Sequence, residues 1–159
     1  MRRPYRDLLL LCLLVSAPSA GASAQVASDT HPAMRTVERL FDAMRARDTA
    51  ALRAAFVERA TLASWSERDG QPRLGGDSLS AFLVSVANAP KELVLDERLY
   101  NPKVEVSDGL ASVWVEYDLY VSDRFSHCGV DAFHLARTQD GWKIVHLIDT
   151  RRRTGCPTR

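Results

Sequence analysis

The chain has 159 residues, 46% of them hydrophobic and 26% charged, with a formal net charge of +1 at pH 7. This length suits one domain with its own hydrophobic core rather than a miniprotein that depends on disulfides. A near-neutral chain without a basic motif is not typical of a nucleic-acid-binding protein.

The first 24 residues have the parts of a signal peptide. A basic start is followed by an apolar run, Leu8–Val15, and by a small-x-small cleavage site, Ala22–Ala24. The apolar run is much shorter than the roughly 20 residues that cross a bilayer, so we expect no membrane anchor. The sequence therefore predicts a protein that is exported to the periplasm or the medium.

Residues 25–32 are predicted to be a linker, residues 33–156 a single domain, and residues 157–159 a tail. The domain opens with apolar residues at the spacing of an amphipathic helix, with Asp29 or Thr30 as its cap. The apolar positions of this helix are Met34, Val37, Leu40, Phe41 and Met44.

Two further helices are predicted in the N-terminal half. Asp48 or Thr49 is the expected cap of a short second helix. A third helix is expected to begin at Asp77 or Ser78 and to end before Pro90.

The remaining segments alternate apolar and polar residues as strands do. A strand is expected at residues 60–66 and a polar loop at 67–76, and further strands at 93–100, 103–107, 110–121 and in a hairpin over 125–150. Asp-Gly pairs at 108–109 and 140–141 are signals for tight turns between strands. Helices followed by an antiparallel meander predict an α+β fold in which the helices cover one face of a curved sheet.

The strand before the second Asp-Gly pair places His127 and Asp131 on one face together with Phe133. The register of the hairpin decides which residues of the last strand join that face: Trp142, Ile144, His146 and Ile148, or Val145, Leu147 and Asp149. The strand 110–121 is expected to point its more apolar set inward: Val113, Val115, Tyr117, Leu119 and Val121.

The order of these elements, with a meander that ends in DGWKI, resembles the nuclear transport factor 2-like (NTF2-like) superfamily. The segments LASVWVEYDLYV, SHCGVDAFHLARTQDGWKIVHL and TRRRTGC are similar to exported bacterial members of its SnoaL-like and lumazine-binding-like branches. The resemblance covers about residues 33–156 and implies a cone-shaped α+β fold with a pocket in its mouth. It implies no single activity, because the superfamily includes isomerases, dehydratases, epoxide hydrolases and non-catalytic binding modules.

Four residues are the candidates to line the implied pocket: Trp65, Tyr117, His127 and Asp131. Relatives such as ketosteroid isomerase and scytalone dehydratase transfer protons with Asp, Tyr and His in this pocket. By that resemblance Asp131 or His127 is a candidate base and Tyr117 a candidate donor to an oxyanion.

Each candidate also has a structural explanation. Asp131 is placed to form an ion pair with Arg151 or Arg152 on the next strand, and His127 to bond at a turn. Core packing explains Tyr117 and Trp65. The sequence carries no zinc, P-loop, dinucleotide or serine-hydrolase motif, so we expect neither a metal nor a cofactor.

Cys128 and Cys156 remain after the predicted cleavage, and an oxidising compartment favours a disulfide between them. A two-residue turn in the hairpin puts Cys128 opposite Arg153, so Gly155 must allow the tail to fold back. An intermolecular disulfide and a free, reactive Cys128 are the alternatives.

The sequence thus predicts an exported domain that binds a small, mostly apolar molecule. The alternatives are a cofactor-independent isomerase, dehydratase or hydrolase, and a purely structural module. The run Arg151–Arg153 is interpreted as a solvated strand end, with an anion site as the alternative. A mixed apolar and polar outer face suits a homodimer: Trp114, Glu116, Asp118 and Tyr120.

Overall fold

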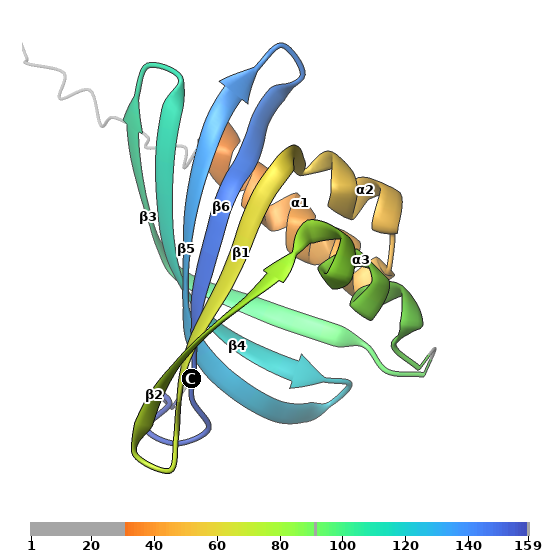
Figure 1. The fold of residues 1–159 in the computed structure, drawn as a ribbon, viewed down its shortest axis with the longest axis vertical. Helices are drawn as coiled ribbons and strands as arrows, with labels where there is room; N and C mark the ends of the chain where they lie inside the picture. The colour runs from red at the N-terminus through yellow and green to blue at the C-terminus, as the bar shows by residue number, and fades with distance from the viewer. Residues whose placement is uncertain (1–30, 91, 159) are drawn as a thin grey trace, which may run out of the picture.

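Three helices cover one face of a curved six-stranded sheet in this computed structural model (Figure 1). The structure describes residues 31–90 and 92–158. The predicted signal peptide lies outside these residues, as do most of the predicted linker and the last residue of the tail. The fold belongs to the α+β class that the sequence predicts.

Side chains cap the helices at their N-termini. His31 precedes α1 (Pro32–Ala46), and its Nδ1 accepts a hydrogen bond from a first-turn amide at 3.1 Å. The predicted caps Asp29 and Thr30 lie outside the described residues. Asp48 caps α2 (Thr49–Ala54) and Ser78 caps α3 (Leu79–Asn88), each through backbone amides of the first turn. None of the helices in residues 31–90 and 92–158 has both the length and the apolar character needed to cross a bilayer.

The sheet has the strand order β2-β1-β6-β5-β4-β3. The strands are β1 Phe56–Arg68, β2 Gln71–Ser78, β3 Leu95–Ser107, β4 Leu110–Val121, β5 Arg124–Thr138 and β6 Gly141–Arg151. Neighbouring strands are antiparallel except β1 and β6, which are parallel. The sheet is therefore mixed rather than wholly antiparallel, because the last strand returns beside the first.

Two segments differ from the sequence prediction. Residues 67–76, predicted to be a loop, contain the turn at Asp69-Gly70 and most of β2. Every residue of β2 is exposed, so this strand lacks the apolar alternation by which strands are recognised. The predicted strands 93–100 and 103–107 are one strand, β3, with an irregularity in register between Tyr100 and Lys103.

The β5–β6 hairpin turns at Gln139-Asp140, one residue before the predicted Asp140-Gly141 turn, and a bulge then shifts its register. His134 pairs with His146, whereas Leu135 pairs with Ile144. The extra residue is on β6, so every pair beyond it moves by one position.

This register shift sets the cross-strand partners of two residues, Asp149 and Cys128, whose pairing the sequence analysis left open or predicted wrongly. Asp149 lies directly opposite Asp131, and both line the concave face of the sheet. Cys128 lies opposite Arg152. The predicted partner, Arg153, is wrong because the turn lies one residue earlier than predicted. That turn alone would pair Cys128 with Arg151, and the bulge then moves the pairing to Arg152.

The hydrophobic core fills one end of the space between the helices and the sheet. The apolar stripe of α1 packs there against inward residues of the sheet, and the rings of Phe41 and Phe133 meet edge to face with centroids 6.1 Å apart. Inward residues of the sheet in this core include Val113, Val115, Phe133, Leu135 and Ile144. The other end of the space is hollow.

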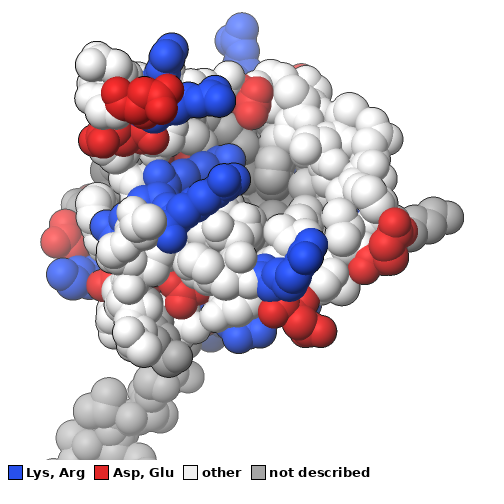
Figure 2. Space-filling model, turned by 90° about the horizontal axis from the view of Figure 1, so that it is seen from below, with Lys and Arg blue, Asp and Glu red and all other residues white. Residues whose placement is uncertain are grey.

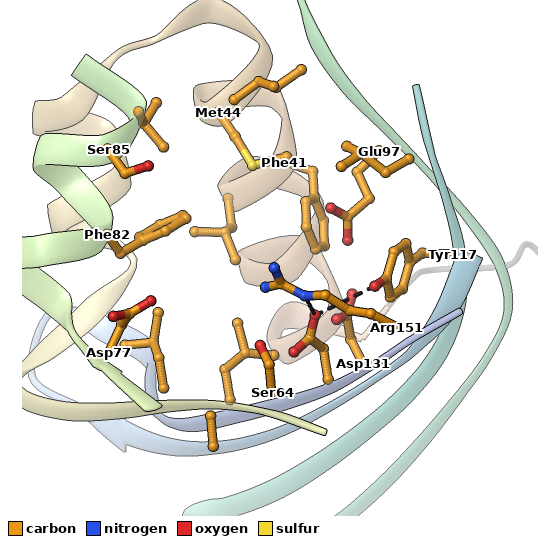
Figure 3. A pocket seen from close by; sticks show the side chains of 18 of the residues that line it. Phe41, Met44, Ser64, Asp77, Phe82, Ser85, Glu97, Tyr117, Asp131 and Arg151 are labelled. Atoms are coloured by element: carbon orange, nitrogen blue, oxygen red, sulfur yellow. Dashed lines mark hydrogen bonds and ion pairs between the residues drawn. The ribbon is translucent and has the colours of Figure 1, made fainter. Parts of the chain in front are cut away.

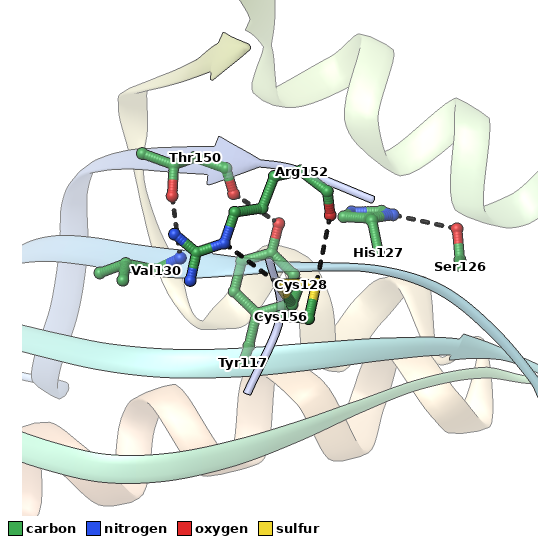
Figure 4. Close-up of a disulfide and its surroundings, with 8 residues drawn as sticks. All are labelled: Tyr117, Ser126, His127, Cys128, Val130, Thr150, Arg152 and Cys156. Atoms are coloured by element: carbon green, nitrogen blue, oxygen red, sulfur yellow. Dashed lines mark hydrogen bonds between the residues drawn. A yellow bond between two sulfur atoms is a disulfide. The ribbon is translucent and has the colours of Figure 1, made fainter. Parts of the chain in front are cut away.

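A disulfide between Cys128 and Cys156 holds the C-terminal tail against β5, as the sequence predicts (Figure 4). The backbones of Arg152 and Cys128 exchange two hydrogen bonds of 3.0 Å. Cys128 is on the face of β5 opposite to Asp131, because odd and even residues of a strand point to opposite faces. The tail therefore contacts the convex face of the sheet, away from the helices.

Candidate functional site

A cavity of about 610 Å³ lies between the helices and the concave face of the sheet. Figure 2 shows a hollow at this end of the molecule, with Lys and Arg side chains beside it. Residues of α1, α3 and all six strands line the cavity. The site therefore depends on the complete fold rather than on one local motif.

The helix side of the cavity is apolar. Phe41 and Met44 on α1 and Phe82 on α3 point into the same space (Figure 3). The other apolar residues of the lining are Leu40, Leu62, Val86, Leu95, Leu119 and Leu147. This side would remove an apolar group from water without offering it hydrogen bonds.

The sheet side carries ionisable residues. Six of them, which we call the floor cluster, are Glu97 on β3, Tyr117 on β4, His127 and Asp131 on β5, and Asp149 and Arg151 on β6. Strand alternation brings them together, because residues two or four apart on one strand point to the same face. Cross-strand pairing then aligns neighbouring strands, as it does for Asp131 and Asp149.

Tyr117, Asp149 and Arg151 form a hydrogen-bonded group within the floor cluster. The Tyr117 hydroxyl donates to the backbone oxygen of Thr150 at 2.9 Å and lies 3.3 Å from Oδ2 of Asp149. The Nε atom of Arg151 donates to the same Oδ2 at 2.6 Å. Burial and the Asp149 carboxylate raise the pKa of Tyr117, so its hydroxyl stays protonated at neutral pH. The charge of Asp149 is thus balanced by Arg151.

Glu97 and Asp131 form a carboxyl pair beside this group. Their side chains are hydrogen-bonded to each other, which two carboxyl groups achieve only with a proton between them. Burial, and then the neighbouring Glu97, raise the pKa of Asp131 well above its ordinary value. Burial also raises the pKa of Glu97 to about 7. The pair therefore holds one proton near neutral pH.

His127 lies beside Tyr117 in the lining. Its ring meets the Tyr117 ring edge to face at 5.7 Å, and its Nδ1 is 3.0 Å from the Ser126 hydroxyl. Burial and the positive charge of Arg151 lower the pKa of His127. The imidazole is therefore neutral at pH 7 and available for hydrogen bonding rather than ion pairing.

The structure brings together three of the four predicted pocket residues: Tyr117, His127 and Asp131. Trp65 is not in the lining. Its neighbour Ser64 points into the cavity, so Trp65 points to the convex face, where it is 41% exposed and lies opposite Leu74 of β2. The sequence prediction chose Trp65 by its position at a strand end without knowing which face it occupies.

The structural explanation offered for Asp131 is also not what the structure contains. Arg151 pairs with Asp149 instead, and the guanidinium of Arg152 lies 3.3 Å from the Cys128 sulfur on the other face. The partner of Asp131 is the carboxyl group of Glu97. Asp131 is therefore a buried acid in an acid pair, not half of a salt bridge.

Sequence reasoning missed Glu97 and left open whether Asp149 shares the face of Asp131. For Glu97 a signal existed: it alternates with Leu95 and Leu99, so an acid occupies the apolar face of a strand. For Asp149 no local signal placed it, since its face depends on the hairpin bulge.

The floor cluster has the chemistry of hydrogen bonding and proton transfer. Among the described residues, no three His, Cys, Asp or Glu side chains are arranged to hold a metal ion. The Glu97–Asp131 pair can take up or release a proton near neutral pH, which suits a general acid or base. The same oxygens can equally hold the polar end of a bound molecule.

The sequence matches a family model described as "Putative lumazine-binding" over residues 28–147. No curated protein sequence is significantly similar to the chain.

Several solved structures share the fold. An NTF2-like protein of unknown function from Shewanella baltica superposes with a TM-score of 0.61 at 17% identity, covering 80% of this chain and 96% of that chain. A second, from Silicibacter pomeroyi, gives 0.56 at 22% identity, with 75% and 92% covered. A protein with a cystatin-like fold from Nostoc punctiforme gives 0.62 at 8% identity, with 80% and 94% covered. These likenesses confirm the NTF2-like fold and carry no function.

Proposed function

We propose that this chain, which belongs to the NTF2-like family described as "Putative lumazine-binding", binds a small molecule in the cavity. One observation carries the proposal: a single cavity of about 610 Å³ has an apolar helix side and a floor cluster of convergent polar groups. Small-molecule sites are usually cavities of about 300–1,000 Å³ with this division. The family description does not identify the molecule.

The proposed ligand has an apolar body and one polar end. Its body would pack against Phe41, Met44 and Phe82, and its polar end would meet the floor cluster. Tyr117, His127 and Asp131, which the sequence singled out, belong to the proposed contacts, and Glu97, Asp149 and Arg151 join them. The side chains of the described residues leave this space open rather than plugging it, which argues against the alternative of a purely structural module.

The first test is the native mass of the protein, purified under conditions that keep weakly bound molecules. Mass above that of the chain or its dimer supports the proposal, and the released molecule can then be identified. Ser85 and its neighbour Val84 are both exposed, but only Ser85 lines the cavity. Ser85→Trp should therefore abolish the added mass, and the matched control Val84→Trp should retain it. Retention in both variants would contradict binding in this cavity.

A second candidate function is cofactor-independent proton transfer. It is favoured by the Glu97–Asp131 pair, whose raised pKa values allow a proton to be accepted and returned near pH 7. The hydroxyl of Tyr117 is engaged by Thr150 and Asp149, so the acid pair is a better candidate for this role than Tyr117.

The proton-transfer candidate has its own test. A released ligand would be incubated in heavy water with the wild-type protein or with Asp131→Asn. Deuterium at carbon with the wild type and none with the variant supports catalysis. No deuterium in either sample would leave binding as the function.

We further infer that the protein is exported and forms a homodimer. The signal-peptide pattern of residues 1–24 supports export, and so does a disulfide, which persists in oxidising compartments. N-terminal sequencing of the exported protein should begin at Gln25, and a retained Met1 would contradict cleavage. The homodimer is supported by the exposed Trp114 on the convex face. Light scattering should give a dimer for the wild type and a monomer for Trp114→Ser.

A further inference from the structure

We propose that the molecule bound in the cavity carries a protonated nitrogen, as an amine or an amidine, that donates hydrogen bonds to Asp131 and Asp149. This inference rests on the proposed ligand-binding function and adds the chemical class of the ligand. It follows from the charges of the lining, from two buried carboxyl oxygens and from the aromatic rings that line the same cavity.

The lining of the cavity has an excess of acid. Four carboxyl groups line it, from Asp77, Glu97, Asp131 and Asp149, against one guanidinium, that of Arg151. Arg151 is already paired with Asp149 at 2.6 Å. The lining therefore attracts a positive charge and repels a carboxylate or a phosphate.

In the part of the chain that the structure describes, two buried carboxyl oxygens of the lining have no donor other than, for Asp131, the neighbouring carboxyl group of Glu97. Among the described residues, no backbone amide, hydroxyl or basic side chain donates to Oδ2 of Asp131 or to Oδ1 of Asp149. Asp131 is 3% exposed and Asp149 is 8% exposed. A buried acceptor without a donor costs about 1–3 kcal/mol, and more when it is charged. A ligand that brings donors into the cavity removes this cost.

The two oxygens belong to residues that face the cavity side by side. Asp131 and Asp149 are directly opposite each other on β5 and β6. Directly opposed side chains have Cβ atoms about 4.5–5.5 Å apart. One ammonium group has three N–H donors, so it can serve both carboxyl groups at once.

Aromatic rings complete a site for a cation. Phe41 and Phe82 line the helix side, and Tyr117 lines the floor (Figure 3). A positive charge near the face of an aromatic ring is stabilised, by about 0.5–2 kcal/mol depending on its hydration. An amine attached to an apolar or aromatic body therefore suits both sides of the cavity.

A cation also competes with the proton that Glu97 and Asp131 share. The charged or titratable groups that line the cavity with Asp131 are Asp77 on β2, Glu97 on β3, Tyr117 on β4, His127 on β5, and Asp149 and Arg151 on β6, whereas α1 and α3 contribute uncharged residues. A bound ammonium would stabilise both carboxylates, so binding should release about one proton. The affinity should accordingly increase as the pH rises toward about 7, where Glu97 titrates.

The test compares matched molecules that differ only in their polar end. Tryptamine, tryptophol and indole-3-acetate share one aromatic body, as do 2-naphthylethylamine, 2-naphthylethanol and 2-naphthylacetate. Their dissociation constants would be measured by ligand-observed NMR and calorimetry, in two buffers of different ionisation enthalpy. We expect each amine to bind at least about tenfold more tightly than its alcohol, with proton release, and each carboxylate to bind weakest.

Variants of the protein test which residues bind the amine group. Asp131→Asn should weaken the amines about tenfold and leave the alcohols within about twofold. Glu105→Gln, a change of an exposed carboxyl on the same strand as Glu97, is the control and should change neither. Thermal melts of each variant establish that it is folded.

Each result has a distinct meaning. If the alcohols or carboxylates bind as tightly as the amines, the inference that the ligand carries a protonated nitrogen is wrong, but the proposed binding function is still supported. Full amine affinity in a folded Asp131→Asn variant would overturn the residue assignment. No binding of any of the six molecules at millimolar concentration would overturn both this inference and the proposed function.

Discussion

Gly129 and Thr150 approach so closely that a Cβ atom on Gly129 would lie 1.8 Å from the backbone oxygen of Thr150. The same oxygen accepts the hydrogen bond of the Tyr117 hydroxyl at 2.9 Å. The absence of a side chain at position 129 therefore lets β6 come close to β5, where the floor cluster is assembled.

Gly129→Ala is expected to destabilise the fold severely. The added methyl group meets backbone rather than a flexible side chain, so β6 must move, at a cost of about 3 kcal/mol or more. Gly109→Ala is the control, because its Cβ would have only an ordinary 3.9 Å contact with Arg137. Urea unfolding of both variants measures the difference. Equal midpoints would show that the strands are less constrained than this contact requires.

Glu97→Gln is expected to change the dependence of stability on pH. The folded-state pKa of Glu97 is raised from 4.5 to about 7, so the folded protein holds more protons than the unfolded chain between these values. The stability that this proton provides is complete below about pH 4.5 and is lost as the pH rises to about 7. Relative to the wild type, the variant should gain on the order of 2 kcal/mol across that range.

Unfolding free energies of the wild type and Glu97→Gln at several pH values measure this gain. Glu105→Gln, which changes an exposed carboxyl of the same strand, should follow the wild type. Parallel curves for all three proteins would mean that folding does not raise the pKa of Glu97.

Tyr117→Phe is expected to cost about 1–2 kcal/mol, because it leaves the backbone oxygen of Thr150 without its donor in a buried place. Tyr120→Phe is the matched control. The Tyr120 ring lies under the guanidinium of Arg98 at 4.0 Å, a contact that phenylalanine keeps. Thermal unfolding of the two variants should separate them by several degrees, and an equal loss would argue against a specific role for the Tyr117 hydroxyl.

Cys156→Ser is expected to lower the free energy of unfolding by about 2–4 kcal/mol. The disulfide closes a loop of sequence separation 28, and its removal gives the unfolded chain more conformations. Wild-type protein treated with a reductant should show the same loss, and the variant should be insensitive to the reductant. Unchanged stability in both experiments would show that the bond is not formed in solution.

Much of the fold was predictable because its signals are local. The apolar stripe of α1, the cap Asp48 and the existence of a tight turn beside Asp140 each follow from a few neighbouring residues. β2 was not recognised because none of its residues is buried, so its sequence has no apolar period.

The candidate site was only partly predictable because it depends on register. Alternation along single strands put Asp131 and His127 on one face, and the fold resemblance directed that face and Tyr117 toward the cavity. A bulge in β6 decided that Asp149 joins them, and no pattern within the strand marks that bulge. Trp65 was assigned to the wrong face for the same reason: a strand's orientation is set by its partners.

The parallel pairing of β1 with β6 has a consequence for how the protein is made. Thr61 and His146, which meet in this pairing, are 85 residues apart in the chain. During synthesis the edge of β1 that pairs with β6 stays without its partner strand until nearly the whole chain has been made. A chain that stops before Gly141 would expose the edges of β1 and β5 together, and we expect such fragments to aggregate or to be degraded.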